Sequence, residues 1–87
     1  MTTVFGKIIR REIPADIVFE NDRVMAFRDI RPVAPVHIVI IPKKEIPDLQ
    51  SVSNEDLPLI GEMVAAAQQI ARDLGLDEGY RLLTNNG

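Results

Sequence analysis

The apolar residues near the start of the chain fall at a helical spacing. Residues 3–10 carry Phe5 and Ile8 on one side, with Thr3 in a position to cap the first turn. Pro14 stops such a helix from continuing, because proline lacks the N–H that a helix interior needs. The pattern therefore predicts a short N-terminal helix over residues 3–10.

The spacing then changes to that of strands. Three strand-like runs follow one another along the chain: residues 16–20, 24–30 and 36–42. Asn21 and Asp22 separate the first two runs and predict a tight hairpin turn, since this pair tolerates a positive φ. The segment 31–35 contains prolines, which lack N–H donors, so we expect a loop there. The third run is continuously apolar, which predicts a strand buried on both faces.

The second half of the chain predicts one long helix and a last strand. From Ser53 to Leu74 the apolar residues recur about every 3.6 positions and form one stripe: Ile60, Met63, Val64, Ala67, Ile70, Ala71 and Leu74. Ser53 is a possible cap, although Pro58 allows the helix to begin a turn later, and Gly75 is placed to end it. Residues 80–85 predict a fourth strand, and the turn-prone residues after it indicate a hairpin whose second arm is missing.

Composition narrows the class of protein. The 87 residues are 46% hydrophobic and 26% charged, which is typical of one small globular domain, here of the α+β class and spanning residues 1–87. The chain has no cysteine and a single histidine, His37, so we expect no disulfide, no metal site and no cofactor. No run approaches the ~20 apolar residues of a membrane span, and charge interrupts the N-terminus. These features predict a cytoplasmic protein without membrane contact.

Charge is distributed unevenly along the chain. Residues 1–44 contain eight Lys and Arg against five Asp and Glu, whereas residues 45–87 contain two against eight. A small anionic ligand is therefore expected to bind the first half, although such an imbalance also fits a solvated face. Nucleic acid is not expected as a partner, because the chain has no basic run and only one Tyr and three Phe for stacking on bases.

Two polar residues are candidates for chemistry, and each has a structural alternative. His37 could act as an acid, base or nucleophile, or could be a hydrogen-bonded structural residue at the start of a strand. Asp29 could bind a sugar diol with both carboxylate oxygens, or could cap the loop that follows it. Four apolar residues could line a slot for a flat ligand or belong to the core: Phe5, Ile8, Phe27 and Ile30.

Three segments together carry a specific resemblance: "FGKIIRREIPA", "AFRDIRPVAPVHIVIIPK" and "GYRLLTN". They resemble the histidine triad (HIT) family, in particular its branch of histidine triad nucleotide-binding proteins, and the similarity continues over essentially the whole chain. The resemblance implies an α+β fold with a HIT-like antiparallel sheet, a short N-terminal helix and one long helix. Four strands of that sheet are expected here and a fifth is missing, so that the domain is C-terminally truncated.

The resemblance also implies a purine nucleotide, such as AMP, as the ligand and a homodimer as the assembly. By similarity, the base lies between apolar residues of the first helix and second strand, namely Val4, Phe5, Ile8, Phe27 and Ile30. Asp29 binds the ribose hydroxyls, Asn85 lies by the phosphate, and His37 lies at the back of the catalytic centre. Arg28, on the wall of the site, is a local departure that could change the preference for the leaving group.

The sequence departs most from the family pattern in its histidines. HIT enzymes hydrolyse nucleoside phosphoramidates and related nucleotidyl bonds through a nucleotidyl-histidine intermediate on a His-x-His-x-His segment, which is absent from this sequence. Because covalent catalysis needs its nucleophile, we expect impaired hydrolysis, with His37 as the one catalytic histidine present. The alternatives are a non-catalytic AMP-binding module and a fragment that another chain completes.

Overall fold

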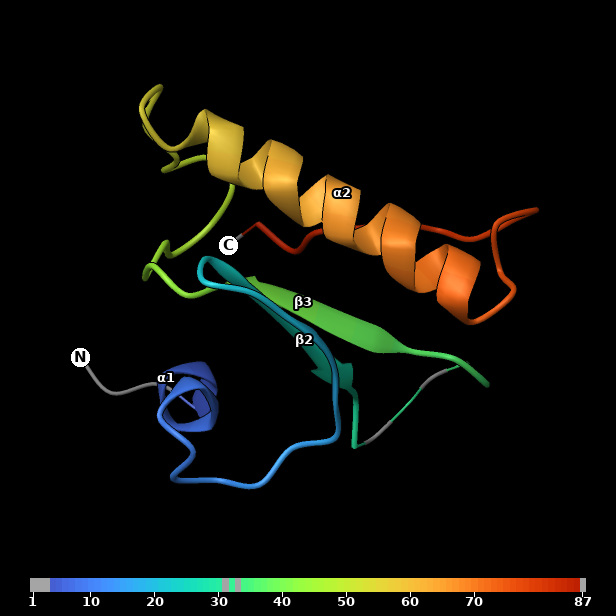
Figure 1. The fold of residues 1–87 in the computed structure, drawn as a ribbon. Coiled ribbons are helices and arrows are strands. Elements are labelled where there is room, and N and C mark those ends of the chain that lie inside the picture. The colour runs from blue at the N-terminus through green and yellow to red at the C-terminus, as the bar shows by residue number, and fades with distance from the viewer. Residues whose placement is uncertain (1–3, 31, 33, 87) are drawn as a thin grey trace.

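The protein is described by a computed structural model for residues 4–30, 32 and 34–86. Its elements, in chain order, are α1 (Val4–Ile9), β1 (Ile17–Glu20), β2 (Val24–Arg28), β3 (Ile38–Pro42) and α2 (Leu57–Asp73) (Figure 1). This arrangement confirms the expected α+β class with an antiparallel sheet, one short helix and one long helix. Thr3, the expected cap of α1, lies outside the described residues.

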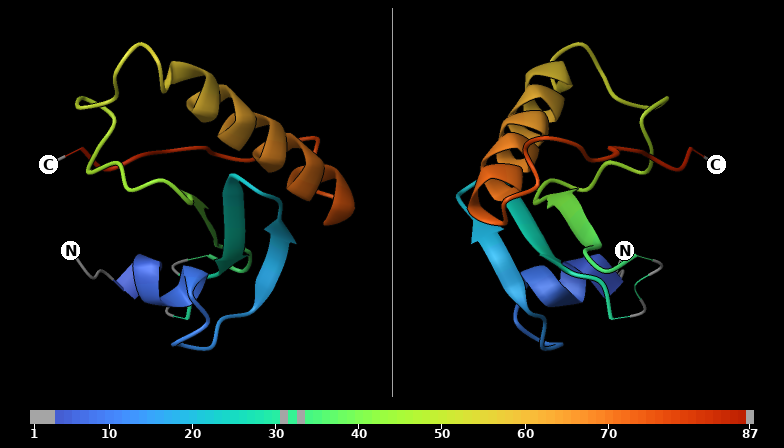
Figure 2. Two further views of the ribbon diagram at one scale, coloured as in Figure 1. Left: turned by 60° about the vertical axis from the view of Figure 1, so that its left-hand side comes forward. Right: turned by 90° about the vertical axis from the view of Figure 1, so that its right-hand side faces the viewer.

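The two helices cover opposite faces of the sheet, so the molecule has three layers (Figure 2). On the α1 face, Ile8 joins a buried cluster with Met25, Phe27 and Ile41. On the α2 face, Val24 packs with residues of the long helix, Leu59 among them. Neighbouring residues of β2 alternate between these clusters, as the pleat of a strand requires.

The central strand is β2, because the sheet order is β1-β2-β3 and both pairings are antiparallel. Val24, Met25 and Ala26 have no exposed surface, whereas β3 has only Ile41 in the buried class. The expectation of a third strand buried on both faces is therefore wrong. The strand with neighbours on both sides is the buried one, and an apolar run alone does not reveal that position.

The hairpin between β1 and β2 is closed by a side chain. Oδ1 of Asn21 accepts hydrogen bonds from the backbone N–H groups of Arg23 and Val24 at 2.9 and 2.8 Å. The expectation of a positive φ at Asn21 or Asp22 is wrong, since Arg11 is the one non-glycine residue with positive φ within the described ranges. Asparagine stabilises this turn by replacing a backbone acceptor.

The long helix begins later than expected, at Leu57, with Asp56 as its N-cap residue. Ser53 lies in the preceding turn, where its C=O accepts from the N–H groups of Asp56 and Leu57 at 3.0 and 3.1 Å. The Asp56 carboxylate makes no capping hydrogen bond; it pairs with Nζ of Lys44 at 2.8 Å. The helix start is therefore tied to the end of β3 by an ion pair.

The helix ends at a glycine, as expected. Gly75 has a φ of 70°, a region that glycine adopts without steric cost. The N–H of Leu76 donates to the C=O of Ala71 at 2.7 Å, and that of Gly75 donates to Arg72 at 3.2 Å, which is the Schellman pattern. The buried stripe differs in part from the expected one, because Val64 is 40% exposed. Its buried members are Leu59, Ala66, Ala67, Ile70 and Ala71.

Residues 80–85 do not form the expected fourth strand. Segment 80–86 is exposed and runs back beside α2 towards the loop after β3 (Figure 2). Its end is fixed there, because Oδ1 of Asn86 accepts from the backbone N–H of Gln50 at 2.7 Å. A strand exists only where a neighbour completes its hydrogen bonds, and within the described residues the sheet stops at β3.

A charged network links the loop after α1 to the ends of β1 and β3. The Glu20 carboxylate pairs with Nζ of Lys43 at 2.8 Å and with the guanidinium of Arg11. The hydrogen bond from Lys43, and after it the one from Arg11, lowers the pKa of Glu20 below 4.5. A lowered carboxyl pKa stabilises the folded state above the unfolded-state pKa, and this contribution disappears as the pH falls through the folded-state value.

Replacing Glu20 by Gln is therefore expected to lower the melting temperature at pH 7. The difference from the parent chain should shrink as the pH falls below 4.5, since the parent then loses the same charge. Thermal unfolding followed by circular dichroism from pH 7 to pH 3 measures it, with the exposed Glu55→Gln as control. A constant difference across that range would show that the Glu20 charge is not involved.

Candidate functional site

One end of the sheet brings together α1, the end of β2 and the start of β3. Phe5 of α1 faces Phe27 of β2 with ring centroids 6.2 Å apart and ring planes at 45°. Phe27 is buried at 6% exposure, whereas Phe5 is 48% exposed. The pair therefore has one ring fixed in the core and one at the surface.

The one buried residue of α1, Ile8, holds the helix against the sheet. Ile8 is 6% exposed and belongs to the cluster that contains Phe27. Because residues three or four apart share one face of a helix, this anchor brings Phe5 and Val4 to the same rim. Val4 is 61% exposed and is available to contact a ligand.

The polar part of the site lies one step beyond Phe27. The backbone N–H of Asp29 donates to the C=O of His37 at 2.9 Å, which continues the β2–β3 ladder past Arg28 and Ile38. Nδ1 of His37 lies 3.4 Å from Oδ2 of Asp29. Both side chains are partly buried, with 34% and 27% of their surface exposed. The two residues that were candidates separately are therefore neighbours.

Strand alternation separates Arg28 from this group. Phe27 and Asp29 lie on the face that α1 covers, and Arg28 between them belongs to the other face. Nε of Arg28 lies 3.3 Å from Oδ2 of Asp16, and its backbone N–H donates to the C=O of Asp16 at 2.9 Å. The structure thus directs Arg28 towards β1.

Two further expected residues lie outside the compact group. Ile30 follows β2 and is 90% exposed. Asn85 belongs to the exposed segment 80–86, whose end is held at Gln50. The expected site residues on α1 and at the adjoining ends of β2 and β3 are thus Val4, Phe5, Ile8, Phe27, Asp29 and His37.

A cavity of about 170 Å³ is lined in part by Ile8, which belongs to the same buried cluster as Phe27. Its other lining residues follow α1 in the sequence: Arg11, Ile13, Pro14, Ala15 and Ile17. Sequence reasoning missed these residues as site candidates. The available signal was the run of apolar residues around Pro14, directly after the helix that carries Phe5.

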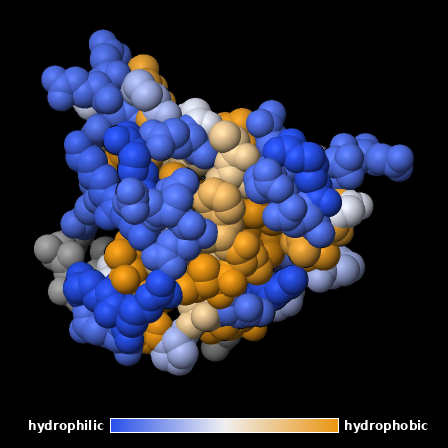
Figure 3. All heavy atoms as spheres, in the orientation of Figure 1, coloured by the Kyte–Doolittle hydropathy of each residue, from blue (hydrophilic) through white to orange (hydrophobic). Residues whose placement is uncertain are grey.

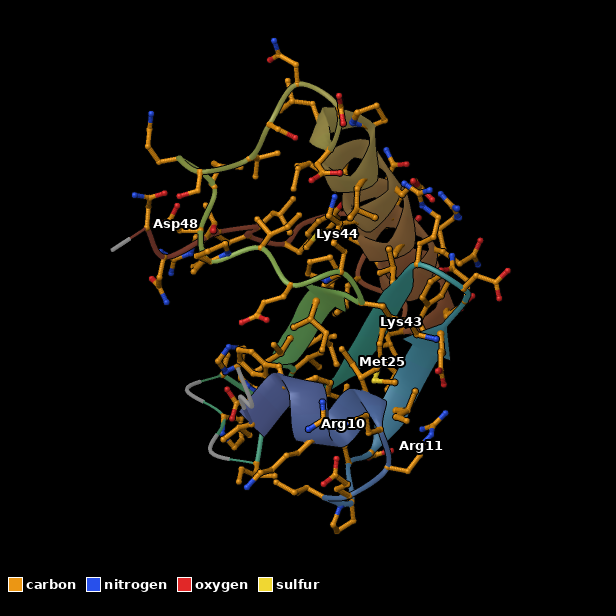
Figure 4. The ribbon with its side chains drawn as sticks, turned by 90° about the vertical axis from the view of Figure 1, so that its left-hand side faces the viewer. Arg10, Arg11, Met25, Lys43, Lys44 and Asp48 are labelled. Atoms are coloured by element: carbon orange, nitrogen blue, oxygen red, sulfur yellow. The ribbon has the colours of Figure 1, made fainter. Side chains whose placement is uncertain are left out.

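The basic residues near α1 and the end of β3 are largely neutralised. Figure 4 shows Arg10 and Arg11 on the α1 side, and Lys43 and Lys44 on the side of the loop that follows β3. Each pairs with a carboxylate: Arg10 with Glu12, Arg11 and Lys43 with Glu20, and Lys44 with Asp56. These ion pairs account for much of the positive charge of the first half, so charge alone does not define an anion site there.

The arrangement suits a flat apolar ring attached to a polyol. The aromatic pair provides stacking surface, and Asp29 provides acceptors at the same edge. Among residues 4–30, 32 and 34–86, no three or more His, Cys, Asp or Glu residues lie together so as to hold a metal ion. No helix in these ranges is long and apolar enough to cross a membrane.

Known proteins are similar to this chain in sequence and in fold. Residues 2–84 match the family described as "Scavenger mRNA decapping enzyme C-term binding". The chain is 51% identical over 85 residues to an uncharacterized HIT-like protein of Synechocystis, a match that covers 98% of this chain and 75% of that protein.

Solved structures agree with these relatives. A HIT family hydrolase from Clostridium thermocellum superimposes with a TM-score of 0.93 at 45% identity, covering 97% of this chain and 74% of that one. A histidine triad nucleotide-binding protein from Candida albicans superimposes with a TM-score of 0.88 at 31% identity, covering 99% and 63%.

Proposed function

The chain belongs to the histidine triad family, and from this premise we propose that it binds a purine nucleotide, such as AMP, between α1 and the end of β2. The base stacks on the aromatic pair, in contact with Val4 and Ile8 and with Ile30 at the rim. The observation that carries the proposal is the Phe5–Phe27 ring pair with Asp29 two residues beyond Phe27 along the same strand.

The difference in exposure between Phe27 and Phe5 supports this assignment. Phe27 is fixed by the core, so its ring loses little conformational entropy when a base stacks on it. Phe5 is half exposed on a six-residue helix anchored at Ile8, and it is free to adjust to a ligand. Asp29 lies two residues beyond Phe27 on the same strand face, where it accepts hydrogen bonds from the ribose hydroxyls.

We further propose that the 87-residue chain turns over nucleotides poorly. The family activity is hydrolysis of nucleoside phosphoramidates and related bonds through a nucleotidyl-histidine intermediate, and His37 is the single histidine of the chain. In this proposal His37 supports the site from its position beside Asp29, and Asn85 serves the phosphate.

Homodimerisation is part of the same proposal. Large apolar side chains are exposed on segment 80–86, namely Tyr80, Leu82 and Leu83, and on α2, where Val64 is 40% exposed. On the face of the molecule seen in Figure 3, hydrophobic residues also lie at the surface between hydrophilic ones. Apolar surface of this kind is stabilised when a partner covers it.

A non-catalytic AMP-binding module, or a subunit that another chain completes, is the second candidate. It is favoured by β3, which has a strand neighbour on one side only within the described residues, and by segment 80–86, which joins no strand of the described sheet. An open sheet edge accepts a further strand from another polypeptide. This candidate shares the nucleotide site and differs in what completes the sheet.

The Asp29→Ala substitution tests the nucleotide site. AMP affinity should fall about 10- to 100-fold, the range that loss of charge-assisted hydrogen bonds produces, whereas adenine should bind as before. Isothermal titration calorimetry measures both ligands. The control is Asp16→Ala, which removes an exposed carboxylate that is ion-paired with Arg28 outside the proposed site. If Asp29→Ala binds AMP as tightly as the parent chain, the site is assigned wrongly.

A further inference from the structure

β2 and β3 both reach the site, and a series of cross-strand residue pairs lies on the face of these strands that α1 covers. Phe27 lies opposite Val39 in the antiparallel register. Two positions further, the N–H of Asp29 donates to the C=O of His37 at 2.9 Å, so these residues form the next pair on that face. The series thus changes from an apolar pair at the core to an ionisable pair at the site.

The side chains of this last pair are held close together. Nδ1 of His37 lies 3.4 Å from Oδ2 of Asp29, within ion-pair distance. Their partial burial limits screening by water. The nearest charged residue along β2, Arg28, is directed to Asp16 on the other face. His37 is therefore the charged or polar neighbour that the strand register itself assigns to Asp29.

We infer that His37 is a positioning residue for nucleoside recognition. It holds the Asp29 carboxylate in the orientation that receives the 2′- and 3′-hydroxyls, and it thereby sets the selectivity for ribose over 2′-deoxyribose. This inference rests on the proposed nucleotide site and deepens it. It assigns the role to Nδ1 of His37, the nitrogen that faces Asp29, and does not depend on any attack on phosphate.

The physical reason is preorganisation. A carboxylate at the end of a strand rotates about two bonds, and a diol is bound through both oxygens only in some of these rotamers. A neighbour that fixes one oxygen removes this rotamer freedom before the ligand arrives, so less entropy is lost on binding. Each carboxylate oxygen has two acceptor directions, so Oδ2 can face His37 and still accept from a hydroxyl.

Three substitutions of His37 separate its two nitrogens. Asn places an amide N–H near the position of Nδ1, Gln places one near that of Nε2, and Ala removes both. Dissociation constants for AMP and 2′-deoxy-AMP, measured by calorimetry at pH 7, give a selectivity ratio for each variant. We expect a ratio of about tenfold in the parent chain, the value of one charge-assisted hydrogen bond. It should fall towards one in His37→Ala and His37→Gln and recover in His37→Asn.

Adenine affinity should be unchanged in all three variants, because the base does not contact this pair. The double variant Asp29→Ala, His37→Ala should be no less selective than Asp29→Ala alone, since His37 acts through Asp29. Circular dichroism melts identify any variant that fails to fold. If His37→Ala unfolds, the comparison of the Asn and Gln variants decides the question, since each retains a polar amide at the position.

The possible failures are distinguishable. If His37→Ala keeps the parent ratio while Asp29→Ala loses it, the inference is wrong and the nucleotide site stands. Recovery in His37→Gln without recovery in His37→Asn would assign the role to Nε2 and also overturn the inference. If the parent chain binds AMP and 2′-deoxy-AMP equally, the inference is wrong and the nucleotide site is still decided by Asp29→Ala. If it binds neither ligand, the proposed nucleotide site fails and the inference fails with it.

Discussion

The 87-residue chain is expected to hydrolyse adenosine 5′-phosphoramidate about 10⁴- to 10⁶-fold more slowly than a HIT hydrolase that carries the His-x-His-x-His segment. Covalent catalysis divides one displacement at phosphorus into two easier steps only when the nucleophile is present. The single histidine of this chain lies beside Asp29, and the role proposed for it is to orient that carboxylate. Its proposed role is in binding, so nucleotide affinity should survive the loss of turnover.

The measurement is release of AMP from the phosphoramidate by a preparation whose intact mass corresponds to residues 1–87. A HIT hydrolase with its three histidines, assayed at the same concentration, is the positive control. Turnover that remains within about tenfold of that control and disappears in His37→Ala would contradict the prediction. It would mean that His37 serves as nucleophile or base, and the catalytic assignment would have to start from that residue.

Replacing Met25 by Ala is expected to lower the free energy of unfolding by about 2–5 kcal/mol and to leave the protein only marginally stable at 25 °C. Met25 has no exposed surface and lies in the cluster of Ile8, Phe27 and Ile41 that anchors α1. A large-to-small change at such a position costs about 2–5 kcal/mol, against a total stability of about 5–15 kcal/mol for a domain and the lower part of that range for a small one. Stability and the nucleotide site therefore depend on the same residue.

Urea unfolding followed by circular dichroism measures this effect. Met25→Leu is the matched control, because a hydrophobic exchange of similar volume usually costs less than about 1.5 kcal/mol. A free energy of unfolding for Met25→Ala within about 1 kcal/mol of the parent chain would show that the cluster under α1 contributes less than its burial indicates.

The strands show how far local pattern predicts this fold. Apolar runs located β1, β2 and β3, and the order of the expected elements together with the family resemblance indicated an antiparallel α+β fold. Burial was assigned to β3 although β2 is the buried strand, because order within the sheet depends on partners distant in sequence. Residues 80–85 have a strand-like composition but no strand neighbour within the described residues, so the pattern alone overestimated the sheet.

The helix boundaries show the same limit on a smaller scale. Gly75 ends α2 as expected, since a positive φ at the end of a helix is a local property of glycine. Asp56 replaces Ser53 at the start, and its carboxylate is held by Lys44 from the end of β3. The contact between Lys44 and Asp56 joins residues twelve positions apart, so the local residue pattern that marks a helix start does not reveal it.

Part of the candidate site could also be predicted. The resemblance identified Phe5, Phe27 and Asp29, which α1 and β2 carry to one end of the sheet. The pairing of Asp29 with His37 could not be predicted, because it depends on the strand register. A shift of one residue would move His37 to the other face. The same alternation directs the side chain of Arg28 to Asp16. This contact depends on the sheet and cannot be read from the sequence alone.

The measurement that tests the central claim most directly is a titration of the ¹⁵N-labelled chain with AMP, followed by amide chemical shifts. A site between α1 and the end of β2 predicts saturable changes that are largest at Phe5, Ile8, Phe27 and Asp29, with little change on the exposed face of α2. Saturable changes confined to α2 or to segment 80–86, or no saturable change at millimolar AMP, would contradict it.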